Sequence, residues 1–103
     1  MELTLLTIPD CPNATAFEER LATVLAGYPG AVVHRRVIGD ERAAAEAGMH
    51  GSPTLLINGA DPFAPAGQAP SLACRLYRDA AGHTAPAPSA EALRQAIAAA
   101  AEG

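Results

Sequence analysis

The junction between an apolar run and a helical pattern near residue 11 constrains the fold most. Residues 2–8 have the length and apolar character of a buried strand. Directly after them, Phe17, Leu21 and Val24 recur at helical spacing, and Gly27 begins a stop signal. The chain therefore begins with a strand that leads straight into a helix.

Cys11 lies at this junction, followed by Pro12. Proline is well tolerated at the first position of a helix because its missing N–H would have no partner there. This predicts that Pro12 opens the helix and that Cys11 is its N-cap. Free backbone donors and the positive end of the helix dipole would then favour the thiolate of Cys11. A thiolate attacks disulfides and binds soft metals.

The remaining pattern predicts further strands and helices with clear boundaries. Asp40 can cap a short helix that Gly48 closes, and Ser89 can cap the last helix. The expected elements after the first helix are a strand over 31–38, a helix over 41–47, strands over 54–57 and 71–78, and a helix over 90–101. This β-α-β-α-β-β-α order predicts one α/β domain over residues 1–103, with a four-stranded mixed sheet flanked by helices.

Composition narrows the classes of partner. The 103 residues carry a net charge of −4 and no lysine, so a nucleic-acid partner is not expected. No apolar run approaches the ~20 residues that span a bilayer, and no signal-peptide pattern opens the chain. We therefore expect a cytoplasmic protein with no membrane partner, whose two cysteines are reduced.

A second motif lies at Gly51-Ser52-Pro53, which opens the apolar strand over 54–57. A cysteine at a strand-to-helix junction followed by a strand-opening Ser-Pro resembles the thioredoxin superfamily. The resemblance implies a thioredoxin-like fold, a cis Ser52–Pro53 bond beside Cys11, and a substrate pocket lined by Pro12, Asn13, Ser52 and Pro53.

The sequence departs from the dithiol pattern of that superfamily because Ala14 stands where a resolving cysteine would be. Cys74 is the only other thiol. It alternates with Leu72 and Leu76, so it is either the partner of Cys11 or a filler of the core. Asp10 precedes the thiol and can serve as a proton donor, and Asp61 in the long segment 61–70 can reach the same rim.

A narrower resemblance covers nearly the whole chain. Residues 51–63 and 74–78 are similar to small actinobacterial thioredoxin-like proteins often labelled alkylmercury-lyase-like. Organomercurial lyases hold Hg(II) with two thiolates and protonate the leaving carbon with an aspartate. The resemblance implies Cys11 and Cys74 as metal ligands, with Asp10 or Asp61 as the acid.

Three functions follow as expectations. The first is thiol–disulfide or other thiol redox chemistry by Cys11, with or without Cys74, and with no bound cofactor. The second is soft-metal capture or lyase chemistry, and the third is a non-catalytic interaction module, so whether the chain is an enzyme stays open. The expected partners are a small thiol, a disulfide, a soft-metal ion or a protein thiol.

Overall fold

The computed structural model describes residues 1–64, 67–79 and 81–102 and has an α/β architecture. Its helices are α1 (Ala14–Leu25), α2 (Glu41–Ala47) and α3 (Ala90–Glu102). Its strands are β1 (Glu2–Thr7), β2 (Val32–Val37), β3 (His50–Ser52), β4 (Thr54–Ile57), β5 (Ser71–Cys74), β6 (Tyr77–Arg78) and β7 (Thr84–Ala85).

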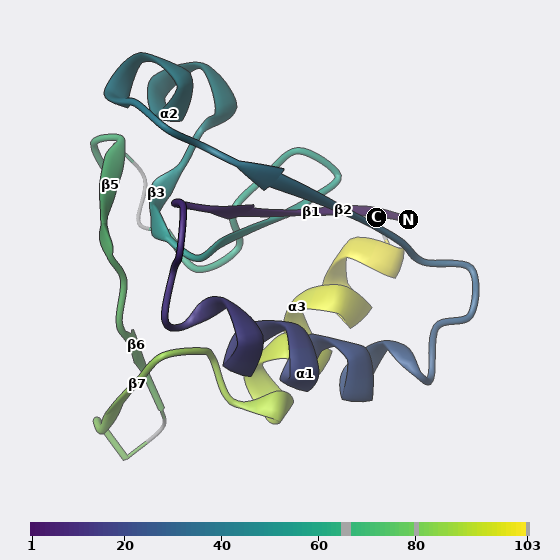
Figure 1. Ribbon diagram of the computed structural model, residues 1–103. Helices are drawn as coiled ribbons and strands as arrows, with labels where there is room; N and C mark the ends of the chain where they lie inside the picture. Colours follow the sequence, from purple (N-terminus) through teal and green to yellow (C-terminus); the bar gives the residue numbers. More distant parts are fainter. Residues whose placement is uncertain (65–66, 80, 103) are drawn as a thin grey trace.

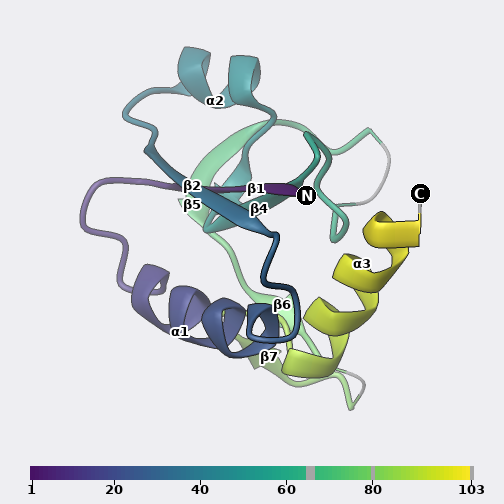
Figure 2. The same cartoon turned by 90° about the vertical axis from the view of Figure 1, so that its right-hand side faces the viewer.

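The main sheet has β1 at its centre. β1 pairs in parallel with β2 and antiparallel with β4, which gives the strand order β2-β1-β4. Helices α1 and α3 cover one face of this sheet, and α2 lies over the other (Figures 1 and 2). The strand-to-helix junction at the end of β1 therefore connects the sheet to the α1 layer.

The core divides between these two faces because side chains alternate along β1. Leu3 and Leu5 face α1 and α3, where they pack with Phe17, Leu93 and other buried residues. On the other face, Leu6 packs against α2 in a smaller cluster whose buried members are Leu6, Ile38, Ala44 and Met49. The strand predicted over residues 2–8 is thus buried on both sides.

The two later helices begin as their capping residues predict. Asp40 accepts a hydrogen bond from the Ala43 amide at 2.7 Å, and Gly48 ends α2 in the left-handed conformation. The Ser89 hydroxyl accepts from the Ala92 amide at 3.1 Å at the start of α3. Both helices are confirmed to within one residue.

The expected fourth strand over 71–78 is wrong as a single element. It is broken into β5 and β6, and β5 pairs in parallel with β3 rather than joining the main sheet. The break follows from packing, because Leu72 lies against the α2-side cluster whereas Tyr77 belongs to the α1-side core. The chain must therefore pass from one face of the sheet to the other between these residues (Figure 1).

This crossing also changes the side chains expected to alternate with Cys74. Leu76 is 61% exposed and is no part of the core. Antiparallel β6 and β7 form a small ribbon beyond it. The hydrogen-bonded main sheet therefore has three strands within the described residues, not four.

β2 is an edge of the main sheet and is largely open to solvent. Val32 and Val37 are 50% and 66% exposed. Between them stand His34, Arg35 and Arg36, all exposed, and Arg35 pairs with Glu18 of α1 at 2.8 Å. This strand contributes little to the core and carries two of the seven arginines of the chain.

We predict that Phe17→Ala lowers the free energy of unfolding by about 3–5 kcal/mol, because it empties a fully buried site. The Phe17 ring also meets the Tyr77 ring edge-on, with centroids 5.7 Å apart. Urea unfolding measures the loss. The control Val37→Ala, at an exposed position, should change stability by less than about 0.5 kcal/mol. Equal effects of the two variants would contradict the packing described.

Candidate functional site

The turn that carries Cys11 differs from the predicted helix cap. Helix α1 begins at Ala14 with Asn13 as N-cap, and Asn13 makes no side-chain capping bond. The Ala14 amide donates to the Cys11 carbonyl at 3.3 Å, which closes a turn with Pro12 at its second position. Asn13, at φ −95° and ψ −7°, has the third-position geometry of a type I turn. Proline favours this turn, so Cys11 precedes α1 by one turn and is not its cap.

The Cys11 sulfur instead meets a side chain from β3. The Ser52 hydroxyl donates a hydrogen bond to Sγ at 2.9 Å. The same hydroxyl oxygen accepts from the Ile8 amide at 3.0 Å. The oxygen thus accepts one hydrogen bond from the backbone while its proton is donated to the sulfur. Ser52 is fully buried, so the two hydrogen bonds of its hydroxyl have a fixed geometry.

The Ser52–Pro53 peptide bond is cis, as the resemblance to the thioredoxin superfamily implies. The Pro53 ring is fully buried, and the Pro53 carbonyl accepts a hydrogen bond from the Tyr77 hydroxyl. Ser52 and Pro53 are thus held between the turn of Cys11 on one side and β6 on the other. The predicted association of Cys11 with the Ser-Pro motif is confirmed through the Ser52 hydroxyl.

Cys74 lies at the end of β5 and is the Cα register partner of Ser52. Ser52 therefore touches one cysteine through its side chain and aligns with the other through its backbone. Both cysteines are free thiols; Cys11 is partly buried and Cys74 is exposed. The expectation that Cys74 fills the core is wrong. Its cooperation with Cys11 stays a prediction.

The other residues expected around Cys11 are on the outside of the turn. Asp10 is exposed and has a left-handed backbone, with φ +55°. Pro12 is exposed and Asn13 is half-buried. These three residues are accessible to a molecule that approaches the sulfur, and their substrate roles stay predictions.

Asp61 lies inside the fold and not on an open rim, with only 2% of its side chain exposed. Its carboxylate accepts from Arg75 Nη1 at 2.6 Å, from the Phe63 amide at 2.9 Å, and pairs with His50 Nδ1 at 3.1 Å. Burial alone would raise the pKa of Asp61. The hydrogen bonds from Arg75, Phe63 and His50, with the charge of Arg75, outweigh burial and hold that pKa below its usual value.

Arg75 connects this ion pair to the Cys11 site. Its backbone N–H donates to the Ser52 carbonyl at 2.9 Å, while its side chain reaches Asp61. The stem of Arg75 passes over Gly51, where an added Cβ would lie 2.9 Å from the Arg75 Cβ. Gly51 also has φ +110°, a conformation that other residues rarely adopt. Glycine is required here by both space and backbone.

Tyr77 completes the buried polar network. The Arg75 guanidinium lies 4.6 Å from the centre of its ring. Burial raises the pKa of the Tyr77 phenol far above its usual value; the Arg75 charge opposes this rise and the Asp61 charge adds to it. The phenol therefore stays protonated and donates to the Pro53 carbonyl.

Sequence reasoning missed His50 and Arg75 because neither is part of a recognisable spacing. His50 lies in β3, which is too short and polar to show periodicity. One feature did point to the network: Arg75 is a lone charge between Cys74 and Leu76 in a pattern that predicted a strand. A charged side chain within a predicted strand needs an ion-pair partner if it is buried, and Asp61 is that partner.

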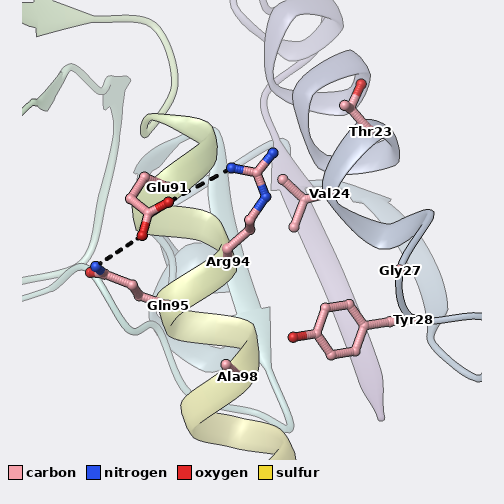
Figure 3. A pocket seen from close by; sticks show the side chains of 8 residues that line it. All are labelled: Thr23, Val24, Gly27, Tyr28, Glu91, Arg94, Gln95 and Ala98. Carbon is pink, nitrogen blue, oxygen red and sulfur yellow. Dashed lines mark hydrogen bonds and ion pairs between the residues drawn. The ribbon is translucent and has the colours of Figure 1, made fainter.

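A separate hollow of about 440 Å³ lies between α1 and α3 (Figure 3). Tyr28 and the Arg94–Glu91 ion pair, with a separation of 3.8 Å, stand along it. Gln95 also donates to Glu91 at 3.3 Å. Neither cysteine lines this hollow, so it is not part of the Cys11 site.

No protein-family model, curated protein or solved structure matches this chain. Over residues 1–64, 67–79 and 81–102, no three His, Cys, Asp or Glu side chains gather as a metal site. In the same ranges no helix has both the length and the apolar character needed to cross a membrane. The predicted segment 61–70 includes Pro65 and Ala66, which lie outside the described residues.

We predict that Asp61→Asn lowers the free energy of unfolding at pH 7 by about 3 kcal/mol, because Arg75 loses a buried counter-ion. In the folded protein the pKa of Asp61 lies below 3.8, so the carboxylate is ionised above that pH. The ion pair with Arg75 then makes its full contribution to stability. Its contribution is lost as the pH falls through the lowered value. The difference between wild type and variant should therefore shrink as urea titrations are carried to pH values progressively below 3.8.

The control is Glu46→Gln, which removes an exposed ion pair with Arg42. It should change stability by less than about 1 kcal/mol at either pH. A loss for Asp61→Asn no larger than that of the control would contradict the role of the buried pair.

Proposed function

We propose that this chain is a thioredoxin-like thiol protein in which Cys11 attacks the disulfide bond of a substrate. The observation that carries the proposal is the 2.9 Å hydrogen bond from the buried Ser52 hydroxyl to the Cys11 sulfur. A hydrogen bond donated to sulfur stabilises the thiolate, which is the attacking form. The α/β order and the Ser52–Pro53 motif beside the thiol support the thioredoxin-like assignment.

The exchange balances without any cofactor. The Cys11 thiolate attacks one sulfur of a disulfide RS–SR′, forms a Cys11–SR mixed disulfide and releases R′S⁻, which takes a proton from solvent. A second thiolate then attacks the Cys11 sulfur and releases RS⁻. Two thiols are oxidised to a disulfide, and the substrate disulfide is reduced to two thiols.

The second thiolate is either Cys74 or a small thiol from solution. Cys74 is favoured by its register with Ser52, which places its backbone one strand away from the residue that touches Cys11. A bond between the two cysteines requires their Cα atoms to come within about 7 Å. Because Cys74 is exposed at the end of a four-residue strand, it can approach Cys11 with a local change of β5.

We expect Cys11 to react faster than Cys74 although Cys74 is more exposed. The variants Cys74→Ser and Cys11→Ser each leave one thiol, and their rates of exchange with 2-hydroxyethyl disulfide can be followed by mass spectrometry. At pH 7 the protein that retains Cys11 should react about two- to fivefold faster, because only its thiol receives the buried hydroxyl bond. Equal rates, or a faster Cys74, would refute Cys11 as the nucleophile.

The hydroxyl itself is tested in the Cys74→Ser background. Ser52→Ala should slow alkylation of Cys11 by iodoacetamide about two- to fivefold. One hydrogen bond is worth about 1 kcal/mol, which sets about fivefold as the upper limit of the slowing. The matched control is Ser71→Ala, whose hydroxyl contacts only the Ala73 amide among the described residues. It should leave the rate unchanged, and an equal slowing by both variants would contradict the proposal.

Soft-metal capture is the second candidate, and the position of both cysteines next to Ser52 favours it, Cys11 through its sulfur and Cys74 through its backbone. Two thiolates bind Hg(II) far more tightly than one because the second ligation is intramolecular. Competitive Hg(II) titration of the same two single variants separates the functions. Loss of most affinity in each variant supports a two-thiol site, whereas wild-type affinity in Cys74→Ser leaves Cys11 as a single reactive thiol.

A further inference from the structure

A hollow of about 410 Å³ beside β6 combines positive charge with apolar walls. We call it the β6 hollow. It is lined by residues from the segment before β5 and from the segment that follows β5: Phe63, Gln68, Arg75, Leu76, Tyr77 and Arg78. We propose that the β6 hollow binds a small organic carboxylate that has an apolar body. This proposal does not rest on the thiol chemistry of Cys11.

Arg75 gives the hollow a guanidinium that is already fixed in place. Its side chain is only 10% exposed, and its Nη1 donates to Asp61 and, at 3.4 Å, to Thr54. Its Cζ lies over the Tyr77 ring at 4.6 Å from the ring centre, a cation–π contact that restrains the group. Nε and Nη2 make no hydrogen bond to a described residue. A fixed, planar donor group of this kind suits the two oxygens of a carboxylate.

Arg78 supplies the charge that Arg75 cannot supply alone. The charge of Arg75 is balanced by Asp61, whereas Arg78 is exposed on the ribbon strand β6. The neighbouring Asp79 makes no ion pair with Arg78; its carboxylate faces the Ala81 and His83 amides and the His83 ring within the turn to β7. Arg75 and Asp61 cancel, so the positive charge at the hollow is that of Arg78, on a chain whose overall charge is −4.

The apolar walls select an organic ligand over a bare anion. Phe63 and Tyr77 meet edge-to-face with ring centroids 5.7 Å apart, and Tyr77 is buried. Leu76 adds an aliphatic side chain that is 61% exposed. A ligand with a carboxylate at the arginines and a short hydrocarbon chain on these side chains would cover apolar surface that is now open to water. Inorganic phosphate offers the charge but not the hydrocarbon.

The test uses the whole protein and hexanoate as the probe, with ¹⁵N–¹H NMR shifts to locate and measure binding. Hexanoate should shift the amides of Leu76 and Arg78 with a Kd in the millimolar range. Neutral hexanamide, which has the same chain, should bind at least about tenfold more weakly, because a charge-assisted hydrogen bond to the arginines is lost. Phosphate should also bind more weakly than hexanoate.

Variants test whether hexanoate binds at the β6 hollow. Arg78→Gln removes an exposed charge without touching the core and should weaken hexanoate binding about tenfold. Arg42→Gln, an exposed arginine of α2, is the matched control and should leave the Kd unchanged. Cys11→Ser and Cys74→Ser should also bind hexanoate normally, so failure of the thiol proposal and failure of this one are distinguishable. Wild-type affinity in Arg78→Gln, or equal binding of hexanamide or phosphate, would overturn the proposal.

Discussion

The ion pair between Asp61 and Arg75 is the contact on which the rest of the site depends. It joins the segment after β4 to the segment after β5, two parts of the chain that the main sheet does not hold together. A buried pair gains little net free energy because both charges lose water, yet a lone partner would be strongly destabilising. The ion pair therefore favours the one position of the crossing segment, between Leu72 and Tyr77, in which both charges are paired.

The same arginine sets the position of Ser52 near Cys11. Its backbone holds the Ser52 carbonyl while its side chain holds Asp61, so the charge network and the thiol site share one residue. Gly51 makes this possible, because any larger residue would push the Arg75 stem away. The Ser52 hydroxyl can contact the sulfur only where β3 is placed, and β3 is placed by its pairing with β5. Changes at Arg75 or Gly51 should thus reach Cys11 without touching it.

Local patterns in the sequence were enough to predict most of the elements but not the edge of the sheet. Periodicity and capping located β1, β4, α2 and α3, because these depend on neighbours in the chain. The start of α1 was misplaced since Pro12 suits a turn as well as a helix. The break between Cys74 and Tyr77 depends on which face of the sheet each side chain joins, and no local pattern contains that choice. Asp61 was found but misjudged, because its partners His50 and Arg75 come from other segments.

The edge strand β2 has a consequence for how copies of this chain meet in a crowded solution. An open edge with exposed Val32 and Val37 offers unpaired backbone groups to any other strand, which is a route to aggregates. Here Arg36 stands in the middle of that edge, whereas the charge of Arg35 is paired with Glu18, so two copies that approach edge to edge would bring their Arg36 guanidinium groups together. Like charges oppose such an approach, and the opposition weakens as salt screens them. The charge on β2 therefore affects how copies of the chain associate in solution as well as how one copy folds.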